Sequence, residues 1–287
     1  ESQSPTFNSI LNTYTAGSSA TSYLVNTHAP SPNNSYFYRV RAVAGGTSSE
    51  WSDTIEVVGA YFDDFTSDDS GWAIRRTTFL EEVRTFYEIG ADKSWLIMQS
   101  ENSWDWGISA PYRKAPIPPY VIEYRSKVAN RGNLVSQGMV FGADWDDENC
   151  PDYSTLEGVY EHDLCFNQFY NLNTIWFGPL KMLFERVDRL VWCPSDPNCQ
   201  IGGSPMKRGG DTQLRDPIPN VDSDDWNVWV VEVRESGITI SVNGQSFMTY
   251  SDTRYINNPY FGVFASTDEY SNSTGRFDYV RITPLGN

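Results

Sequence analysis

The chain has 287 residues, of which 15% are aromatic, and its formal net charge is −16 at pH 7. Such an acidic chain repels the phosphates of nucleic acids and the surfaces of anionic membranes, so we expect neither as a partner. No apolar run reaches the roughly 18 residues that a membrane-spanning helix requires. No convincing 3.6-residue apolar period occurs either, which predicts a chain made mainly of β-strands.

Residues 1–58 contain several strand-like segments, at 7–17, 21–25 and 35–43. In the last of these, Tyr36 and Tyr38 alternate with basic and aromatic residues, and Ser-Glu-Trp-Ser follows at 49–52. This succession resembles the second half of a fibronectin type III domain. The resemblance implies an immunoglobulin-like sandwich whose first strands are missing, since such domains have about seven strands.

The missing strands would leave 21–25 and 35–43 with unpaired backbone groups, an edge that soluble proteins usually protect. Either the strands lie upstream in the polypeptide, or a neighbouring copy donates a strand to complete the sandwich. Head-to-tail donation of a strand does not produce a closed ring of subunits, so the assembly would grow into a filament. We therefore expect neighbouring copies, or an upstream segment of the same protein, as partners.

A second domain is predicted over residues 59–287, and its strands alternate between apolar and polar positions. Segments 120–128 and 137–145 show this pattern. Asn243-Gly244 separates two further alternating runs, which predicts a hairpin because both residues of a type I′ turn need positive φ. Antiparallel strands with one apolar face must cover that face with a second sheet, so we expect a β-sandwich.

The runs WNVWVVEV (226–233), GITISVNGQ (237–245), YFGVFA (260–265) and RFDYVRI (276–282) resemble the last strands of concanavalin A-like jelly rolls. The opening FDDFTSDDSGW (62–72) is similar to their first strand. This superfamily includes laminin-G-like modules, legume-type lectins and laminarinase-type glycosidases. The predicted fold is therefore all-β, with two β-sandwiches: a partial fibronectin type III sandwich followed by a concanavalin A-like jelly roll.

The strand pattern loosens around 146–210, where we expect insertions pinned by disulfides. The four cysteines fall as two close pairs, and an even count in loops is typical of an oxidising compartment. Three connectivities are possible, and we favour the two that close short loops, 150–165 and 193–199. The cysteines are Cys150, Cys165, Cys193 and Cys199. Asn33 and Asn272 stand in formal glycosylation sequons, a short pattern that often arises by chance. We expect an extracellular or cell-surface location.

Clusters of acidic residues in loops would suit calcium, which takes six to eight oxygen ligands. The jelly-roll resemblance implies a structural Ca²⁺ where the first and last strands meet, near Asp63, Asp64 and Asp278. A second cluster mimics the first positions of an EF-hand loop with Asp144, Asp146 and Glu148, but lacks its glycine and its final glutamate. Acidic loops without an ion explain these clusters equally well, and no cofactor is required.

Sugars stack on exposed tryptophan rings, and neighbouring polar groups orient them. Trp104 and Trp106 are two residues apart, so on a strand their rings would form one flat platform. Core packing is the alternative for each tryptophan. The candidate glycan-binding residues are Trp104, Trp106, Trp145, Trp176 and Trp192.

Glycosidases of this fold need two carboxyls on one strand face, but the laminarinase-type Glu-x-Asp-x-x-Glu sequence is absent. The nearest pairs, Glu161/Asp163 and Glu185/Asp188, are more simply explained as surface acids. We therefore expect no enzyme, but a non-catalytic secreted or cell-surface protein with a structural or adhesive role, able to form filaments. The alternative is a carbohydrate-binding module of a larger secreted protein that contacts polysaccharide. A glycoside hydrolase is the least favoured interpretation.

Overall fold

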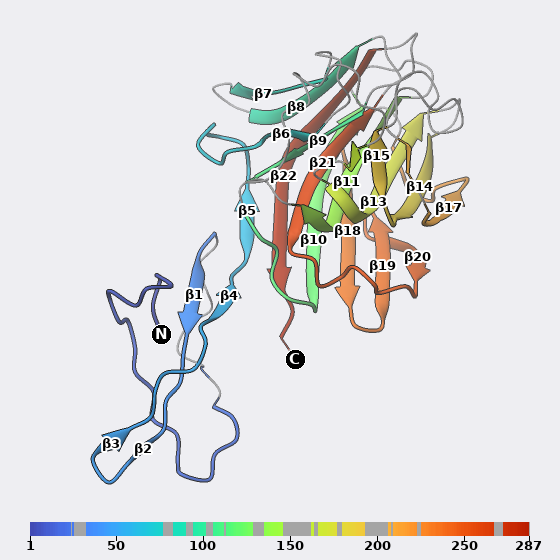
Figure 1. Cartoon of the computed structure of the whole chain (residues 1–287). Coiled ribbons are helices and arrows are strands. Elements are labelled where there is room, and N and C mark those ends of the chain that lie inside the picture. The colour runs from blue at the N-terminus through green and yellow to red at the C-terminus, as the bar shows by residue number, and fades with distance from the viewer. Residues whose placement is uncertain are drawn as a thin grey trace.

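Two stacked β-sheets form the body of the molecule in a computed structural model of the chain (Figure 1). Among the described residues the chain forms strands, turns and irregular segments without an α-helix, and it contains no apolar helix long enough to cross a membrane. The structure describes residues 1–23, 25, 33–76, 83–89, 94–101, 106–111, 113–128, 135–145, 162–163, 166–176, 180–192, 206–207, 209–222, 225–266 and 272–286.

The first sheet is antiparallel and contains most of the strands near the C-terminus. Its central strand β22 pairs with β10 along most of its length, and with β8 and the short β5 on two different stretches. The order is β20 (Gln245–Tyr250), β19 (Gly237–Val242), β18 (Asn227–Arg234), β10 (Tyr120–Val128), β22 (Asn272–Pro284), β8 (Ser94–Glu101) and β7 (Val83–Ile89), with β5 (Tyr61–Asp63) beside β22.

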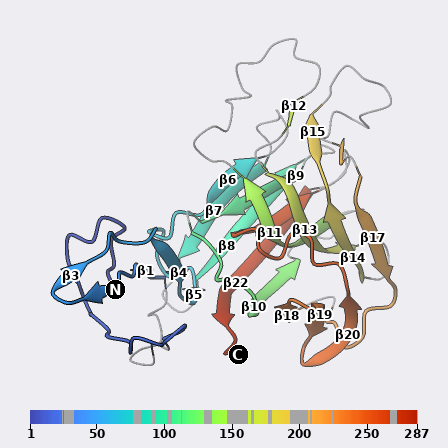
Figure 2. The same ribbon diagram turned by 60° about the horizontal axis from the view of Figure 1, so that its bottom comes forward.

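The second sheet has seven strands, and Figure 2 shows the small β12 and β15 beyond the ends of its central strands. A three-stranded sheet joins β12 (His162–Asp163), β15 (Leu190–Trp192) and β16 (Met206–Lys207). The order of the seven strands is β17 (Asp211–Arg215), β14 (Leu180–Val187), β13 (Phe166–Trp176), β11 (Val135–Trp145), β21 (Tyr260–Ser266), β9 (Trp106–Ala110) and β6 (Ala73–Arg76).

The core lies between the two sheets and is built from alternate residues of their strands. Trp229 of β18 is 1% exposed and stacks on Tyr124 of β10, with ring centroids 6.4 Å apart. From the opposite sheet, Tyr170 and Phe184 stack on each other at 6.0 Å. Because successive side chains of a strand point to opposite faces, this alternation fixes which residues of β13 and β14 face away from the core.

The predicted strands of the second half are confirmed, including the hairpin between β19 and β20. Asn243 and Gly244 have φ values of 46° and 81°, as a type I′ turn requires. The Asn243 carboxamide oxygen also accepts a hydrogen bond of 2.9 Å from the backbone of Val228. The turn is therefore fixed both by its own backbone conformation and by the neighbouring strand.

The first 58 residues do not show the predicted fibronectin type III sandwich. Their described part contains two small antiparallel sheets, β1 (Ser35–Tyr38) with β4 (Ile55–Val58) and β2 (Val43–Ala44) with β3 (Thr47–Ser48). Outside these strands, Ser2 forms one bridge to Phe37. The expected strands at 7–17 and in the described part of 21–25 are irregular, because no described neighbouring segment forms a strand ladder with them. A division into domains at residue 58 stays a prediction.

Hydrogen bonds and an ion pair join this N-terminal region to the sandwich. The Asn33 side chain bonds both backbone groups of Phe62 in β5, accepting from the N–H and donating to the carbonyl, each at 3.0 Å. Lys114 forms an ion pair of 2.9 Å with Glu56 of β4. The first of the two predicted sequons therefore lies at the junction with the sandwich, with its amide hydrogen-bonded to the backbone.

Candidate functional site

Three polar side chains gather on the outer face of the seven-stranded sheet, the face turned away from the core. Asn171 and Asn173 lie on β13, between residues such as Leu172 that belong to the core. Glu185 lies directly opposite Asn171 on β14. We call Asn171, Asn173 and Glu185 the polar patch. Strand alternation explains their common direction, since positions two apart on a strand share a face.

The polar patch is buried although its members are polar or charged. Asn171, Asn173 and Glu185 are 3%, 5% and 8% exposed. The Asn171 amide nitrogen donates a hydrogen bond of 3.3 Å to Glu185 Oε2. This bond fixes the orientation of the Asn171 side chain, because a carboxylate only accepts and must face the amide NH₂ rather than the amide oxygen.

The side-chain oxygens of Asn171 and Asn173 are buried and lack a hydrogen-bond donor in the part of the chain that the structure describes. A buried acceptor without a donor costs about 1–3 kcal/mol, so native proteins rarely keep one without a reason. The two asparagine oxygens lie on adjacent outward positions of one strand, so this face concentrates two unsatisfied acceptors.

The surroundings of the polar patch are apolar, and a glycine beside it lets two strands approach closely. Gly138 of β11 pairs with Asn173 on one side and with Phe264 of β21 on the other. A Cβ at Gly138 would lie 1.7 Å from the Leu172 carbonyl oxygen, so only glycine permits this approach of β11 to β13. The apolar neighbours on this face are Ile108, Ala110, Val140, Ala143, Phe166, Phe169, Val187 and Phe264.

The face becomes more open toward the edge strand β17. Leu183, opposite Asn173 on β14, is half-buried, and its partner Leu214 on β17 is 53% exposed. Ile175 and Lys181 on the other side of Asn173 are also half-buried. A ligand approaching from this edge would meet apolar surface first and then the polar patch.

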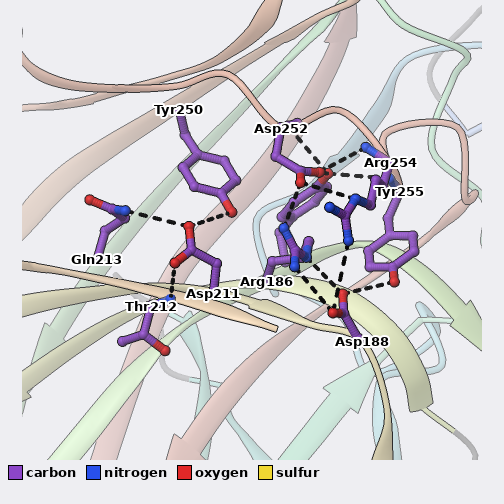
Figure 3. A network of polar contacts seen from close by, with 10 residues as sticks. Arg186, Asp188, Asp211, Thr212, Gln213, Tyr250, Asp252, Arg254 and Tyr255 are labelled. Carbon is purple, nitrogen blue, oxygen red and sulfur yellow. Dashed lines mark hydrogen bonds and ion pairs between the residues drawn. The ribbon is translucent and has the colours of Figure 1, made fainter. Parts of the chain in front are cut away.

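On the opposite side of the same two strands, a polar network holds β13 and β14 together (Figure 3). Tyr170 and Arg186 are cross-strand partners, and both bond Asp252, at 3.1 Å and 2.5 Å. Arg186 also bonds Asp188 at 2.7 Å, and Tyr255 donates to the same carboxylate at 2.9 Å. The residues of this network adjoin Asn171 and Glu185 in sequence, so the network fixes the strands that carry the polar patch.

The network keeps its charges paired, which shifts the pKa values of its members. The hydrogen bond from Arg186 lowers the pKa of Asp188. Burial would raise the pKa of Asp252, but the hydrogen bonds from Arg254 and Tyr170 and the nearby arginine charges outweigh it, so that this pKa is also lowered. Burial, followed by a hydrogen bond to Asp211, raises the pKa of Tyr250 to about 12.

The predicted tryptophans are distributed over several strands. Trp106, Trp145, Trp176 and Trp192 lie in β9, β11, β13 and β15, three of which belong to the seven-stranded sheet. Their side chains and all of Trp104 lie outside the described residues. The glycan platform at Trp104 and Trp106 therefore stays a prediction. The four cysteines, Asp146, Glu148 and the side chain of Asn272 also lie outside the described part.

The proposed calcium ligands near the first and last strands are engaged with other groups. Asp63 accepts hydrogen bonds of 2.8 Å from both the Trp72 indole and the Phe65 backbone. Asp64 accepts from Thr66, and Asp278 pairs with Arg125 at 2.7 Å. Among the described side chains, no group of three or more His, Cys, Asp or Glu could hold a metal ion. The structure therefore gives no support to calcium at these three aspartates.

Sequence reasoning missed Asn171 and Asn173 because it searched for carboxylates and tryptophans. It noted Glu185 only as part of a pair with Asp188, and the structure separates the two: Glu185 faces outward and Asp188 belongs to the Arg186 network. One signal in the sequence could have located the polar patch. In 169–173 asparagines alternate with apolar residues, and this segment is too apolar to be a solvent-exposed edge strand, so the asparagines had to be on a partly buried face.

No protein-family model and no curated protein matches the chain. Solved structures share its fold. A structure described with the words "endo-acting O-glycanases", from human gut microbiota, matches at 12% identity with a TM-score of 0.50, covering 79% of this chain and 99% of its own. A Thermotoga maritima laminarinase catalytic domain matches at 14% identity and a TM-score of 0.48, over 80% of this chain and 98% of its own.

A family 16 endo-glucanase from Bacteroides ovatus matches at 12% identity and a TM-score of 0.48, over 77% of this chain and 99% of its own. The predicted non-catalytic adhesive role, with assembly into filaments, is wrong on this comparison, because the structure that matches with a TM-score of 0.50 is described with endo-acting O-glycanases. The same finding contradicts the prediction that the chain is not an enzyme. What the likeness establishes is the fold: the chain contains a β-sandwich of the jelly-roll type.

Proposed function

We propose that the chain is a carbohydrate-active protein that binds a polysaccharide on the outer face of its seven-stranded sheet. The observation that carries this proposal is the polar patch, whose two asparagine oxygens are buried without donors in the described part of the chain. Sugar hydroxyls are the donors that such acceptors require. The apolar neighbours of the patch suit the C–H faces of sugar rings, as in most ligand sites.

The similar structures support a glycan as the ligand. Their descriptions name mucin breakdown, laminarinase activity and mixed-linkage glucan. The carbohydrate-binding module weighed from the sequence is therefore the preferred interpretation of the site.

Glycoside hydrolysis is the second candidate function, and the position of Glu185 favours it. Most glycosidases place a pair of carboxyls on either side of the scissile bond, and some use a group of the substrate instead of one of them. Glu185 supplies one buried carboxyl on the proposed binding face. The hydrogen bond from Asn171 fixes it beside the two asparagine oxygens.

Affinity electrophoresis and a reducing-end assay test both candidates on the same protein. The purified chain is run through gels containing laminarin, barley mixed-linkage glucan or gastric mucin, and is incubated with each polymer. Retardation in at least one gel supports the binding site, and release of reducing ends that Glu185→Gln abolishes supports hydrolysis. A chain that is retarded by none of the three and releases no reducing ends would overturn the proposed function.

A further inference from the structure

The polar patch differs from an ordinary hydrogen-bonding site because its polarity is fixed before any ligand arrives. The Glu185 carboxylate takes the Asn171 NH₂ group at 3.3 Å, so Asn171 can present only its oxygen to a ligand. The Asn173 oxygen is likewise buried, and no described group donates to it. The patch therefore offers two acceptors.

We infer that the polar patch selects a neutral, unsubstituted sugar unit by accepting hydrogen bonds from two of its hydroxyl groups. This inference rests on the proposed function and specifies its substrate class. Asn171 and Asn173 are two residues apart on one strand, so their Cα atoms are about 6.7 Å apart. That separation matches the width of a sugar ring better than the distance between two neighbouring hydroxyls. The two acceptors would therefore bind hydroxyls on opposite sides of one ring.

The same arrangement excludes other sugars. An ether or ester on either hydroxyl removes the donor and leaves the asparagine oxygen buried and unpaired. A polar site with such an unpaired group binds the substituted sugar much more weakly than the unsubstituted one. A carboxylate or sulfate on the sugar brings a negative charge to a chain whose net charge is −16. Discrimination therefore comes from unpaired groups and repulsion as well as from attraction.

The free protein provides a second readout that needs no ligand. Two buried acceptors without donors destabilise the unliganded fold, whereas an apolar side chain of similar shape at the same place would not. Asn173 is the better position to change, because no hydrogen bond to Glu185 would be lost with it. Asn173→Leu should therefore make the free protein more stable while it weakens ligand binding, a combination that a structural asparagine does not give.

The test compares the wild type, Asn173→Leu and the control Tyr279→Phe by affinity electrophoresis and thermal denaturation. The gels contain laminarin, barley mixed-linkage glucan or gastric mucin, and the carboxymethylated form of each glucan. Tyr279→Phe removes a hydroxyl that donates to Glu123 at 3.0 Å on the other sheet. Its retardation should equal that of the wild type.

We expect Asn173→Leu to bind the retained polymer about tenfold or more weakly, while its melting temperature rises by roughly 2–4 °C. Carboxymethylated glucan should not retard the wild type. If the wild type is retained but Asn173→Leu is retained equally, or melts at a lower temperature, or if carboxymethylated glucan binds as well as the native polymer, the inference fails while the proposed function stands. If no polymer retains the wild type, the proposed function fails and the inference fails with it.

Discussion

Asn171 and Glu185 face each other across β13 and β14, with the amide nitrogen of one 3.3 Å from a carboxylate oxygen of the other. The next cross-strand pair, Tyr170 and Arg186, points to the opposite face of the sheet and is held by Asp252. Two neighbouring cross-strand pairs therefore belong to different features. Tyr170 and Arg186 belong to the charge-paired network on one face of the sheet, and Asn171 and Glu185 belong to the polar patch on the other face. The network stabilises the strands, and the two asparagine oxygens of the patch accept no hydrogen bond from the described residues.

Glu185→Gln should weaken glycan binding with little effect on stability. A glutamine can donate as well as accept, so Asn171 is no longer forced to present its oxygen. We expect the affinity to fall roughly three- to tenfold, the value of one neutral hydrogen bond, and the free energy of unfolding to change by less than about 1.5 kcal/mol. Affinity electrophoresis and urea denaturation measure the two quantities. Glu232→Gln on the other sheet is the control, and an equal loss of affinity in the control would contradict the assignment.

Arg186→Met should lower the free energy of unfolding by about 1.5–3 kcal/mol, because Asp188 and Asp252 lose their charged donor. Arg254→Met is a matched control, since Arg254 approaches the same carboxylates at 4.0 Å and 3.3 Å but its side chain is 59% exposed. An exposed ion pair contributes at most about 1 kcal/mol. Urea denaturation measures the loss in the free energy of unfolding. Equal losses in the two variants would show that the burial of Arg186 contributes nothing to stability beyond an exposed ion pair.

The network also predicts a stability that declines in acid. The pKa values of Asp188 and Asp252 are lowered in the folded protein, so both bind protons more readily when the chain is unfolded. Their contribution is complete above the ordinary aspartate pKa of about 3.9 and is lost as the pH falls through the lowered folded values. Urea midpoints measured across the titration range of carboxyls should therefore fall mainly below about pH 4. Arg186→Met should flatten this decline, and an unchanged slope would show that the decline has another cause.

Gly138→Ala should destabilise the sheet directly beneath the polar patch. Its Cβ would lie 1.7 Å from the Leu172 carbonyl oxygen, so β11 and β13 would have to separate. We expect a loss of about 1–3 kcal/mol in the free energy of unfolding, as for other overpacked sites. Gly17→Ala is the control, because nothing lies within 4 Å of the corresponding Cβ position. A variant at 138 as stable as the one at 17 would show that the strands separate without cost.

The paired tryptophan change Trp104→Ala with Trp106→Ala tests the platform predicted from the sequence. If both rings stack on sugar, polysaccharide retention should be lost while the melting temperature stays nearly unchanged. Burial in the core would instead cost about 3–5 kcal/mol for each ring. Thermal denaturation beside affinity electrophoresis separates the two outcomes, and a large fall in melting temperature would remove the platform from the binding site.

The sequence alone determined the elements whose geometry is local. Period-two alternation located β10, β11, β18, β21 and β22, because one face of each strand is in the core and the pattern records it. Asn243-Gly244 located the hairpin, because few other residues adopt positive φ at both turn positions. The same local reasoning failed over residues 1–58, where strand-like composition does not specify a partner and the described backbone pairs only in two small sheets.

Only the tertiary structure decided the polar patch and the network beneath it. Asn171 and Glu185 are 14 residues apart in sequence, and their contact depends on the register of β13 against β14. A one-residue slip of β13 against β14 would turn one of the two side chains toward the core and break the contact. Asp252 reaches Arg186 from 66 residues away, a relationship that no periodicity contains. Strand formation is thus encoded locally, whereas the unsatisfied acceptors of the site exist only because distant strands pair in one register.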